Sequence, residues 1–267
     1  MDFRPGMNTS VPDILARIIQ YKRAELESPL VSRGELEELA RDARCKHRDF
    51  RAALLRPGAS VIAEFKRASP SKGDIARDCD PADVAQSYQR GGAAALSVLT
   101  DENFFGGSLE DLAAARGNTD LPVLRKDFTL DEYHIAEAAA HCADAVLLIA
   151  SILDTKRLRE LREYADRLSL AALVEVHDEP ELKSAIDSGA TIIGVNNRNL
   201  RTFEVTLETA MGLAGMIPAS VVKVSESGIR TSADVHRLQQ AGYDAFLVGE
   251  HLMRSHDRAA AVRELTR

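Results

Sequence analysis

Two opposite charges interrupt a short apolar segment at residues 61–66, where Glu64 and Lys66 alternate with Ala63 and Phe65. Successive side chains on a β-strand point to opposite faces, so Glu64 and Lys66 project from the same face. Burying a charge is costly unless the charge is paired, and these two residues can pair with each other. The segment therefore predicts a functional site. The alternative is a salt bridge on an exposed edge strand.

Polar side chains end other strand-like segments in the same way. Lys126 is two residues after Leu124, and Glu175 is two residues after Leu173. Asn196 and Glu226 end two further segments, and a chain that brings the strand ends together would gather all of these groups at one mouth. A lysine beside carboxylates is also what a Schiff-base aldolase requires, so that enzyme class remains an alternative.

Glycine-containing loops follow the last two strand-like segments. One contains Ser227 and Gly228, and the other contains Gly249 and Glu250. Glycine permits close approach of the backbone, and helix N-termini present free N–H groups to an anion. These loops predict a phosphate site. The loop at 69–73, rich in serine, could close over a ligand or could be a solvated turn.

The elements that position these residues follow a regular rhythm. Eight short aliphatic segments alternate with amphipathic, well-capped stretches, which is typical of a parallel sheet with helical crossovers. The expected helix caps are Asp80, Ser108, Thr129, Asp154, Asp178 and either Thr231 or Ser232. A closed (β/α)8 TIM barrel is predicted, with its functional groups at the carboxyl ends of the strands; an open doubly wound sheet is the alternative. The eight predicted strands are 61–66, 93–100, 122–127, 144–150, 169–176, 191–197, 221–226 and 244–249.

The first 60 residues do not follow this rhythm. Residues 11–27 and 34–43 are predicted as two helices that precede any strand. We therefore expect one TIM-barrel domain over residues 1–267, with an N-terminal helical extension at 1–60 and the barrel at 61–267. Periodicity alone leaves open whether the extension covers the catalytic mouth or plugs the opposite end.

Composition excludes several classes of partner. The chain of 267 residues has 34 basic and 41 acidic side chains, so its net charge is −7, which disfavours binding to nucleic acid or an anionic membrane. The three cysteines are scattered, which predicts reduced thiols, a cytoplasmic protein and no zinc cluster. His177 is interpreted as structural, and neither a metal nor a cofactor is predicted. The oligomeric state stays open, and a monomer is compatible with the sequence.

Taken in order, these motifs resemble the indole-3-glycerol phosphate synthase family over nearly the whole chain. Asn199 and His251 are minor departures that affect only the loops. The resemblance implies an N-terminal segment that packs over the catalytic mouth. The matching segments are AEFKRASPSKG at 63–73, LSVLT at 96–100, FGGS at 105–108, RKDF at 125–128, VEVH at 174–177, GVNNR at 194–198 and SESGI at 225–229.

The resemblance implies a carboxy-lyase of tryptophan biosynthesis. Its substrate would be 1-(2-carboxyphenylamino)-1-deoxyribulose 5-phosphate, whose ring closes with loss of carbon dioxide and water. Lys126 then suits the proton donor at the ketone and Glu175 the general base, while Lys66, paired with Glu64, would bind the carboxylate or act as a second acid. Which lysine serves which step is left open by the sequence.

The remaining site residues receive supporting roles from the same resemblance. Asn196 and Glu226 would orient hydroxyls or the lysines, and Phe105 and Phe128 would form an apolar wall for the aniline ring. Arg198 either assists anion binding or is a charge on the rim. The substrate-binding set is completed by Ser69 and Ser227, and the phosphate would lie at Gly228, Gly249 and Glu250.

Overall fold

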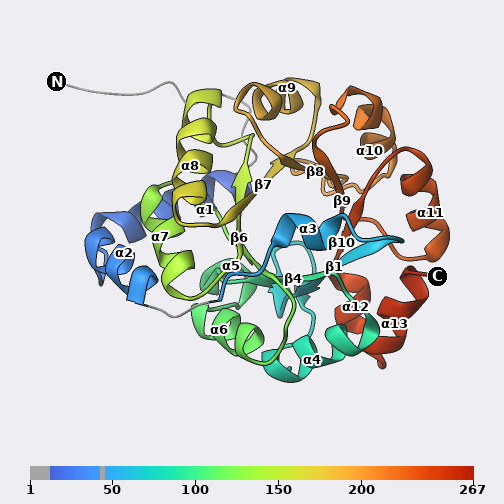
Figure 1. The fold of residues 1–267 in the computed structure, drawn as a ribbon, viewed down its shortest axis with the longest axis horizontal. Coiled ribbons are helices and arrows are strands. Elements are labelled where there is room, and N and C mark those ends of the chain that lie inside the picture. Colours follow the sequence, from blue (N-terminus) through green and yellow to red (C-terminus); the bar gives the residue numbers. More distant parts are fainter. Residues whose placement is uncertain (1–12, 43–45) are drawn as a thin grey trace.

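A closed parallel barrel forms the body of the protein in the computed structural model, which describes residues 13–42 and 46–267 (Figure 1). Its strands follow the order β1-β10-β9-β8-β7-β6-β5-β4, and each pairs in parallel with both neighbours. The predicted (β/α)8 barrel is confirmed, and the open sheet is wrong. The strands are β1 (Ser60–Phe65), β4 (Ala95–Leu99), β5 (Val123–Lys126), β6 (Ala145–Ile149), β7 (Ala171–Val176), β8 (Ile192–Asn196), β9 (Val222–Glu226) and β10 (Ala245–Val248).

Helices surround the barrel, as the alternation of segments predicted. Side chains of Asp80, Ser108, Asp154 and Asp178 accept hydrogen bonds at the expected helix starts. The helices that follow strands are α4 (Pro81–Gly91), α5 (Glu102–Phe105), α6 (Leu109–Gly117), α7 (Glu132–Ala140), α8 (Thr155–Arg167), α9 (Glu179–Asp187), α10 (Glu208–Leu213), α11 (Ser232–Gln240), α12 (Glu250–Arg254) and α13 (Arg258–Leu265), with a 3-10 turn at Ala214–Met216.

The interior of the barrel is an apolar layer beneath the polar strand ends. Ile62, Leu124, Leu173 and Val224 belong to one buried cluster inside the barrel. Each is two residues before one of the predicted site residues, so strand alternation places that polar side chain on the same inner face, nearer the carboxyl end. A second, larger cluster fills the space between the sheet and its helices.

The extension reaches both ends of the barrel. Side chains of α1 (Asp13–Glu27) line a cavity at the carboxyl ends of the strands, while α2 (Arg33–Asp42) packs on α7. The short helix α3 (Phe50–Leu54), which the sequence analysis did not predict, inserts Phe50 and Leu54 into the inner cluster.

Hydrogen bonds show that α3 closes the amino-terminal end of the barrel. The backbone N–H of Arg48 donates to Asp144, just before β6, at 2.8 Å. The guanidinium of Arg51 donates to the carbonyl oxygen of Ser220, just before β9, at 3.3 Å. The cover that the resemblance implies is present in α1. A plug is present as well, in α3, although the resemblance implied the cover alone, and that part of the expectation is wrong.

The structure corrects two smaller expectations. Helix α7 is capped by Asp131, whose side chain accepts from the N–H of Tyr133, and not by Thr129. Cys142 is disulfide-bonded whereas Cys79 is a free thiol, so the expectation of reduced thiols is wrong for Cys142. Within residues 13–42 and 46–267, no helix has the length and apolarity needed to cross a bilayer.

Replacing Phe50 by alanine should destabilise the protein by about 3–5 kcal/mol, because the change leaves a cavity under the inner cluster. Leu55→Ala is the matched control, since Leu55 is 47% exposed and should change stability by less than about 0.5 kcal/mol. Urea unfolding followed by circular dichroism measures both variants. Equal midpoints for the two would show that α3 does not support the barrel.

Candidate active site

A cavity of about 630 Å3 opens at the carboxyl ends of the strands. Its wall contains every residue that the sequence analysis proposed for the site, and these come from the ends of seven strands and the loops after them. The structure therefore brings the predicted residues together at one mouth. They are Glu64, Lys66, Ser69, Phe105, Lys126, Phe128, Glu175, Asn196, Arg198, Glu226, Ser227, Gly228, Gly249 and Glu250.

The ammonium group of Lys126 lies between two carboxylates. Its Nζ is 3.1 Å from Oε2 of Glu175 and 3.7 Å from Oε2 of Glu226. Burial by itself would lower the pKa of Lys126, but Glu175, Glu226 and Glu64 outweigh burial and raise that pKa. Lys126 is therefore a cation at neutral pH.

The two carboxylates beside Lys126 differ in charge. Burial favours the neutral form of Glu175, but Lys126, His177 and Asn196 outweigh burial and hold the pKa of Glu175 well below its usual range. Burial and the negative charge of Glu175 raise the pKa of Glu226 to about 8. The pair thus consists of an ionised Glu175 and a neutral Glu226 at pH 7, an arrangement that separates base from acid.

Glu175 is held from its far side by two further groups. The side-chain amide of Asn196 donates to Oε1 of Glu175 at 3.1 Å. Nε2 of His177 lies 3.3 Å from the same oxygen, and Nδ1 of His177 lies 3.0 Å from Glu181. Burial lowers the pKa of His177, but the two glutamates outweigh it and raise that pKa to about 10. Oε2 of Glu175 is left facing Lys126.

Glu64 and Lys66 form the second ion pair of the cavity, with Nζ 2.5 Å from Oε1 of Glu64. Glu64 is only 5% exposed on a strand of a closed barrel, so the alternative of an exposed edge strand is wrong. Gly249 makes room for this carboxylate, because a Cβ at Gly249 would overlap Oε1 of Glu64. Gly194 does the same for Glu226, whose Oε1 has no hydrogen-bond partner among the described residues.

Part of the cavity wall is aromatic. The rings of Phe105 and Phe128 lie 6.1 Å apart, tilted by 37°. Ser69 stands on a small hairpin made by β2 (Ala68–Ser69) and β3 (Gly73–Asp74), and both Ser69 and the hairpin turn line the cavity. Ser69 is half-buried and Pro70, Lys72 and Gly73 of the turn are exposed, so a solvated turn stays an alternative to a loop that closes over a ligand.

Two loops at the other end of the cavity carry the glycines that predicted an anion site. Ser227 and Gly228 both have left-handed backbone, with φ of 65° and 83°. The amide of Asn197 supports this turn by donating to the carbonyl oxygen of Ser227 at 3.1 Å. Gly249 is the N-cap of α12, whose first residue is Glu250. Only the second loop leads directly into a helix.

Arginine and histidine residues that the sequence analysis did not propose for the site line the same cavity. Arg230, His251 and Arg254 face the cavity together with Arg198. Nε of Arg254 lies 3.3 Å from the carboxylate of Glu250, so these two side chains are paired with each other. Arg230 comes two residues after the SG dipeptide, and that adjacency is the signal that could have identified it.

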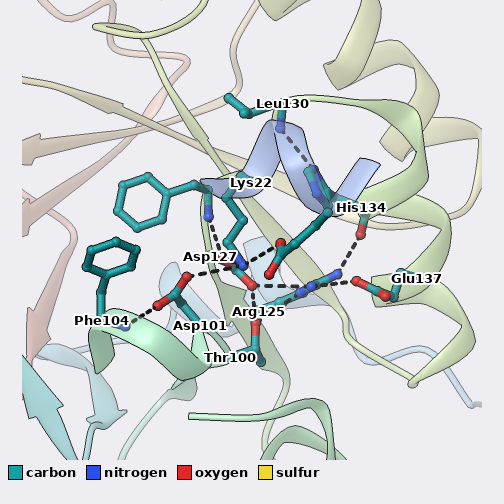
Figure 2. A network of polar contacts seen from close by, with 11 residues as sticks. Lys22, Thr100, Asp101, Phe104, Arg125, Asp127, Leu130, His134 and Glu137 are labelled. Carbon is teal, nitrogen blue, oxygen red and sulfur yellow. Dashed lines mark hydrogen bonds and ion pairs between the residues drawn. The ribbon is translucent and has the colours of Figure 1, made fainter. Parts of the chain in front are cut away.

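A buried polar network surrounds Asp127, which follows β5 and lines the cavity beside Lys126 (Figure 2). Asp127 accepts from Thr100 at 2.6 Å and from Arg125 at 3.2 Å, and Nζ of Lys22 on α1 lies 3.2 Å from its Oδ1. Sequence analysis missed Lys22, because a single lysine on an amphipathic helix is usually solvated. Among the described residues, no three His, Cys, Asp or Glu side chains are placed to hold a metal ion.

Comparison with known proteins identifies the family. Residues 15–265 match the family model described as indole-3-glycerol phosphate synthase. The chain belongs to the indole-3-glycerol phosphate synthase family. The predicted family is thereby confirmed, and the members of this family are enzymes, as the sequence analysis expected.

Relatives with this family name are similar over almost their full length. The indole-3-glycerol phosphate synthase of Albidiferax ferrireducens is 50% identical over 259 residues, which cover 95% of this chain and 98% of the relative. That of Burkholderia vietnamiensis is 49% identical over 261 residues, with the same shares covered.

Solved structures with lower identity share the fold alone. A thiamine phosphate pyrophosphorylase from Pyrococcus furiosus matches with a TM-score of 0.59 at 18% identity, covering 80% of this chain and 94% of that one. A tryptophan synthase α-subunit from Pyrococcus furiosus matches with a TM-score of 0.58 at 15% identity, covering 78% of this chain and 98% of that one.

Gly249→Ala should lower the free energy of unfolding by about 1–3 kcal/mol, because the new methyl group overlaps the Glu64 carboxylate. Gly212→Ala is the control, since Gly212 lies on α10 with open space around it and should gain about 0.5–1 kcal/mol. In a Glu64→Ala background the penalty at Gly249 should shrink. A penalty that persists there would assign Gly249 to the backbone of the loop rather than to Glu64.

Proposed function

We propose that the chain catalyses the family reaction, closing the indole ring of 1-(2-carboxyphenylamino)-1-deoxyribulose 5-phosphate with release of carbon dioxide and water. The observation that carries the proposal is the cavity that holds a buried Lys126–Glu175 pair beside a second lysine and an aromatic wall. The family match over residues 15–265 supports the same reaction. A fluorescence assay for the indole product, with the purified protein and this substrate, tests it.

Lys126 is assigned to the carbon–carbon bond-forming step. The aromatic carbon that bears the carboxylate attacks the ketone carbon, and the carbonyl π electrons move to oxygen. Lys126, which is cationic because carboxylates surround it, donates a proton to that oxygen and stabilises its developing charge. Loss of carbon dioxide then returns the bonding pair to the ring and restores aromaticity.

Glu175 is assigned to proton removal in the dehydration step. The hydroxyl formed from the ketone leaves as water, and a proton must leave the neighbouring position as the ring double bond forms. Oε2 of Glu175 faces Lys126 inside the cavity, while Oε1 is engaged by Asn196 and His177. The base is therefore ionised and aimed before substrate arrives.

The second lysine is assigned to the substrate carboxylate and to the leaving hydroxyl. Nζ of Lys66 lies 2.5 Å from Oε1 of Glu64, and this carboxylate on the inner face of β1 orients the ammonium. Glu226, a neutral acid at pH 7, can donate a hydrogen bond to a substrate hydroxyl or hold Lys126 in place. Phe105 and Phe128 offer a flat apolar surface to the aniline ring.

The phosphate is assigned to the loops after β9 and β10. Ser227, Gly228, Gly249 and Glu250 supply backbone N–H groups there, and the arginines of the same end supply positive charge although the protein is acidic overall. Ser69 on the hairpin approaches the ligand from the other side. The substrate is thus a small phosphorylated molecule, and we assign the protein to the cytoplasm, acting without nucleic acid or membrane.

A Schiff-base aldolase is the alternative enzyme class for a lysine in this position. Such a lysine must be a free amine when it attacks a carbonyl, and enzymes lower its pKa for that purpose. The carboxylates around Lys126 raise its pKa instead. The electrostatics of the cavity therefore favour proton donation over imine formation.

Lys126→Ala should fold and lose on the order of 10²–10³ in kcat, because the change removes the cation assigned to protonation of the ketone oxygen in the bond-forming step. Lys156→Ala is the control, since that lysine is 86% exposed on α8, outside the cavity. Turnover of the ring-closure reaction is measured after circular dichroism has confirmed folding. Near wild-type turnover of Lys126→Ala would reject its role.

Glu175→Gln should lower kcat while leaving substrate binding largely intact, since glutamine keeps the shape of the side chain and cannot accept the proton. Glu160→Gln, on the exposed surface of α8, is the matched control. Steady-state kinetics separate the two parameters. A raised KM with unchanged kcat would make Glu175 a binding residue instead of a base.

A further inference from the structure

One buried lysine fastens the N-terminal helix to the barrel. Lys22 on α1 is 4% exposed, and its Nζ lies 3.2 Å from Oδ2 of Asp101 and 3.2 Å from Oδ1 of Asp127. Glu25, one turn later on the same helix, lies 3.1 Å away. Figure 2 shows the Lys22 side chain directed at both aspartates. The three carboxylates outweigh the effect of burial and raise the pKa of Lys22, so it is charged.

The two aspartates hold the loops that carry the aromatic wall. Asp127 directly follows Lys126, and its Oδ1 accepts from the N–H of Phe128 at 2.8 Å. Asp101 follows β4 and caps α5, because its Oδ1 accepts from the N–H of Phe104 at 2.7 Å. Phe105 is the last residue of α5. Lys22 thus links the loop that carries Phe105 to the loop that carries Phe128, and these two rings form the aromatic wall.

Asp101 depends on Lys22 more than Asp127 does. Oδ2 of Asp101 is buried and has no hydrogen-bond partner among the described residues, and its ion-pair partner there is Lys22, at 3.2 Å. Asp127 is also paired with Arg125, at 3.2 Å. A buried carboxylate that loses its only compensating charge is strongly destabilised. Removing Lys22 should therefore disturb the Asp101 loop first.

Helical spacing links Lys22 to the cavity. Ile14, Ile18 and Lys22 are four residues apart, so they lie on one face of α1. Ile14, Leu15 and Ile18 line the cavity, whereas Lys22 does not. The ring of Tyr21 meets Phe104 edge-on at 6.2 Å. Anchoring Lys22 therefore determines how α1 lies over the mouth.

We propose that Lys22 is a positioning residue, which holds α1 on Asp101 and Asp127 and so fixes both the apolar cover of the cavity and its aromatic wall. The proposal rests on the proposed function, because it assigns that wall to the aniline ring of the substrate. Lys126 and Glu175 pair with each other on β5 and β7, independently of Lys22. Loss of Lys22 should therefore weaken substrate binding more than it slows the chemical steps.

The experiment compares Lys22→Met with Arg23→Met, which removes a charge from the exposed face of the same helix. Lys22→Met should raise KM by about tenfold or more and lower kcat by less than about threefold, and Arg23→Met should match the wild type. Asp101→Asn is the second variant, because asparagine keeps the cap on α5 and loses only the charge. It should raise KM in the same direction and decides the matter if Lys22→Met does not fold.

Hydrogen exchange gives a readout that does not depend on activity. Amides of α1 should exchange faster in Lys22→Met and Asp101→Asn, while those of β7 and β8 stay protected. Wild-type KM together with wild-type exchange of α1 in both variants would overturn the proposal, as would a loss of kcat at unchanged KM. An inactive wild type would reject the proposed function alone, and exchange of α1 would still decide the role of Lys22.

Discussion

The ammonium of Lys126 lies among buried carboxylates, and the need to compensate these buried charges determines how the mouth of the barrel is arranged. Each buried charge must be compensated, since an unpaired one costs several kcal/mol. Lys126 compensates Glu175, and the proton of Glu226 removes a second negative charge beside the same ammonium. Asn196 and His177 then fix the carboxylate from behind. The contacts that compensate the buried charges of Lys126 and Glu175 are thus the same contacts that orient these two groups for proton transfer.

The sequence alone predicted the barrel and the composition of its mouth. Strand alternation is a local property, so Ile62 below Glu64 and Leu124 below Lys126 can be assigned to one face without knowledge of any neighbour. All eight predicted strands are present in the closed barrel. The individual roles in the reaction came from the family resemblance, and they remain proposals.

Other features lay beyond prediction because they depend on partners distant in the chain. The sequence of α3 alone gives no sign that Phe50 packs into the inner cluster of the barrel. The hydrogen bond from Arg51 joins it to Ser220, 169 positions away. Lys22 resembles its exposed neighbour Arg23 until α1 docks on two separate loops. Gly249 was interpreted as a place for phosphate, and the structure adds that its missing side chain accommodates Glu64.

The extension that touches both ends of the barrel also bears on how the chain matures. Its docking partners, from Asp101 and Asp127 to Asp144 and Ser220, are spread over more than a hundred residues. A ribosome releases the extension first, yet it can dock fully only after strands that emerge much later have closed. The extension is thus synthesised before the barrel but becomes stable after it, and its apolar faces stay undocked while the barrel forms.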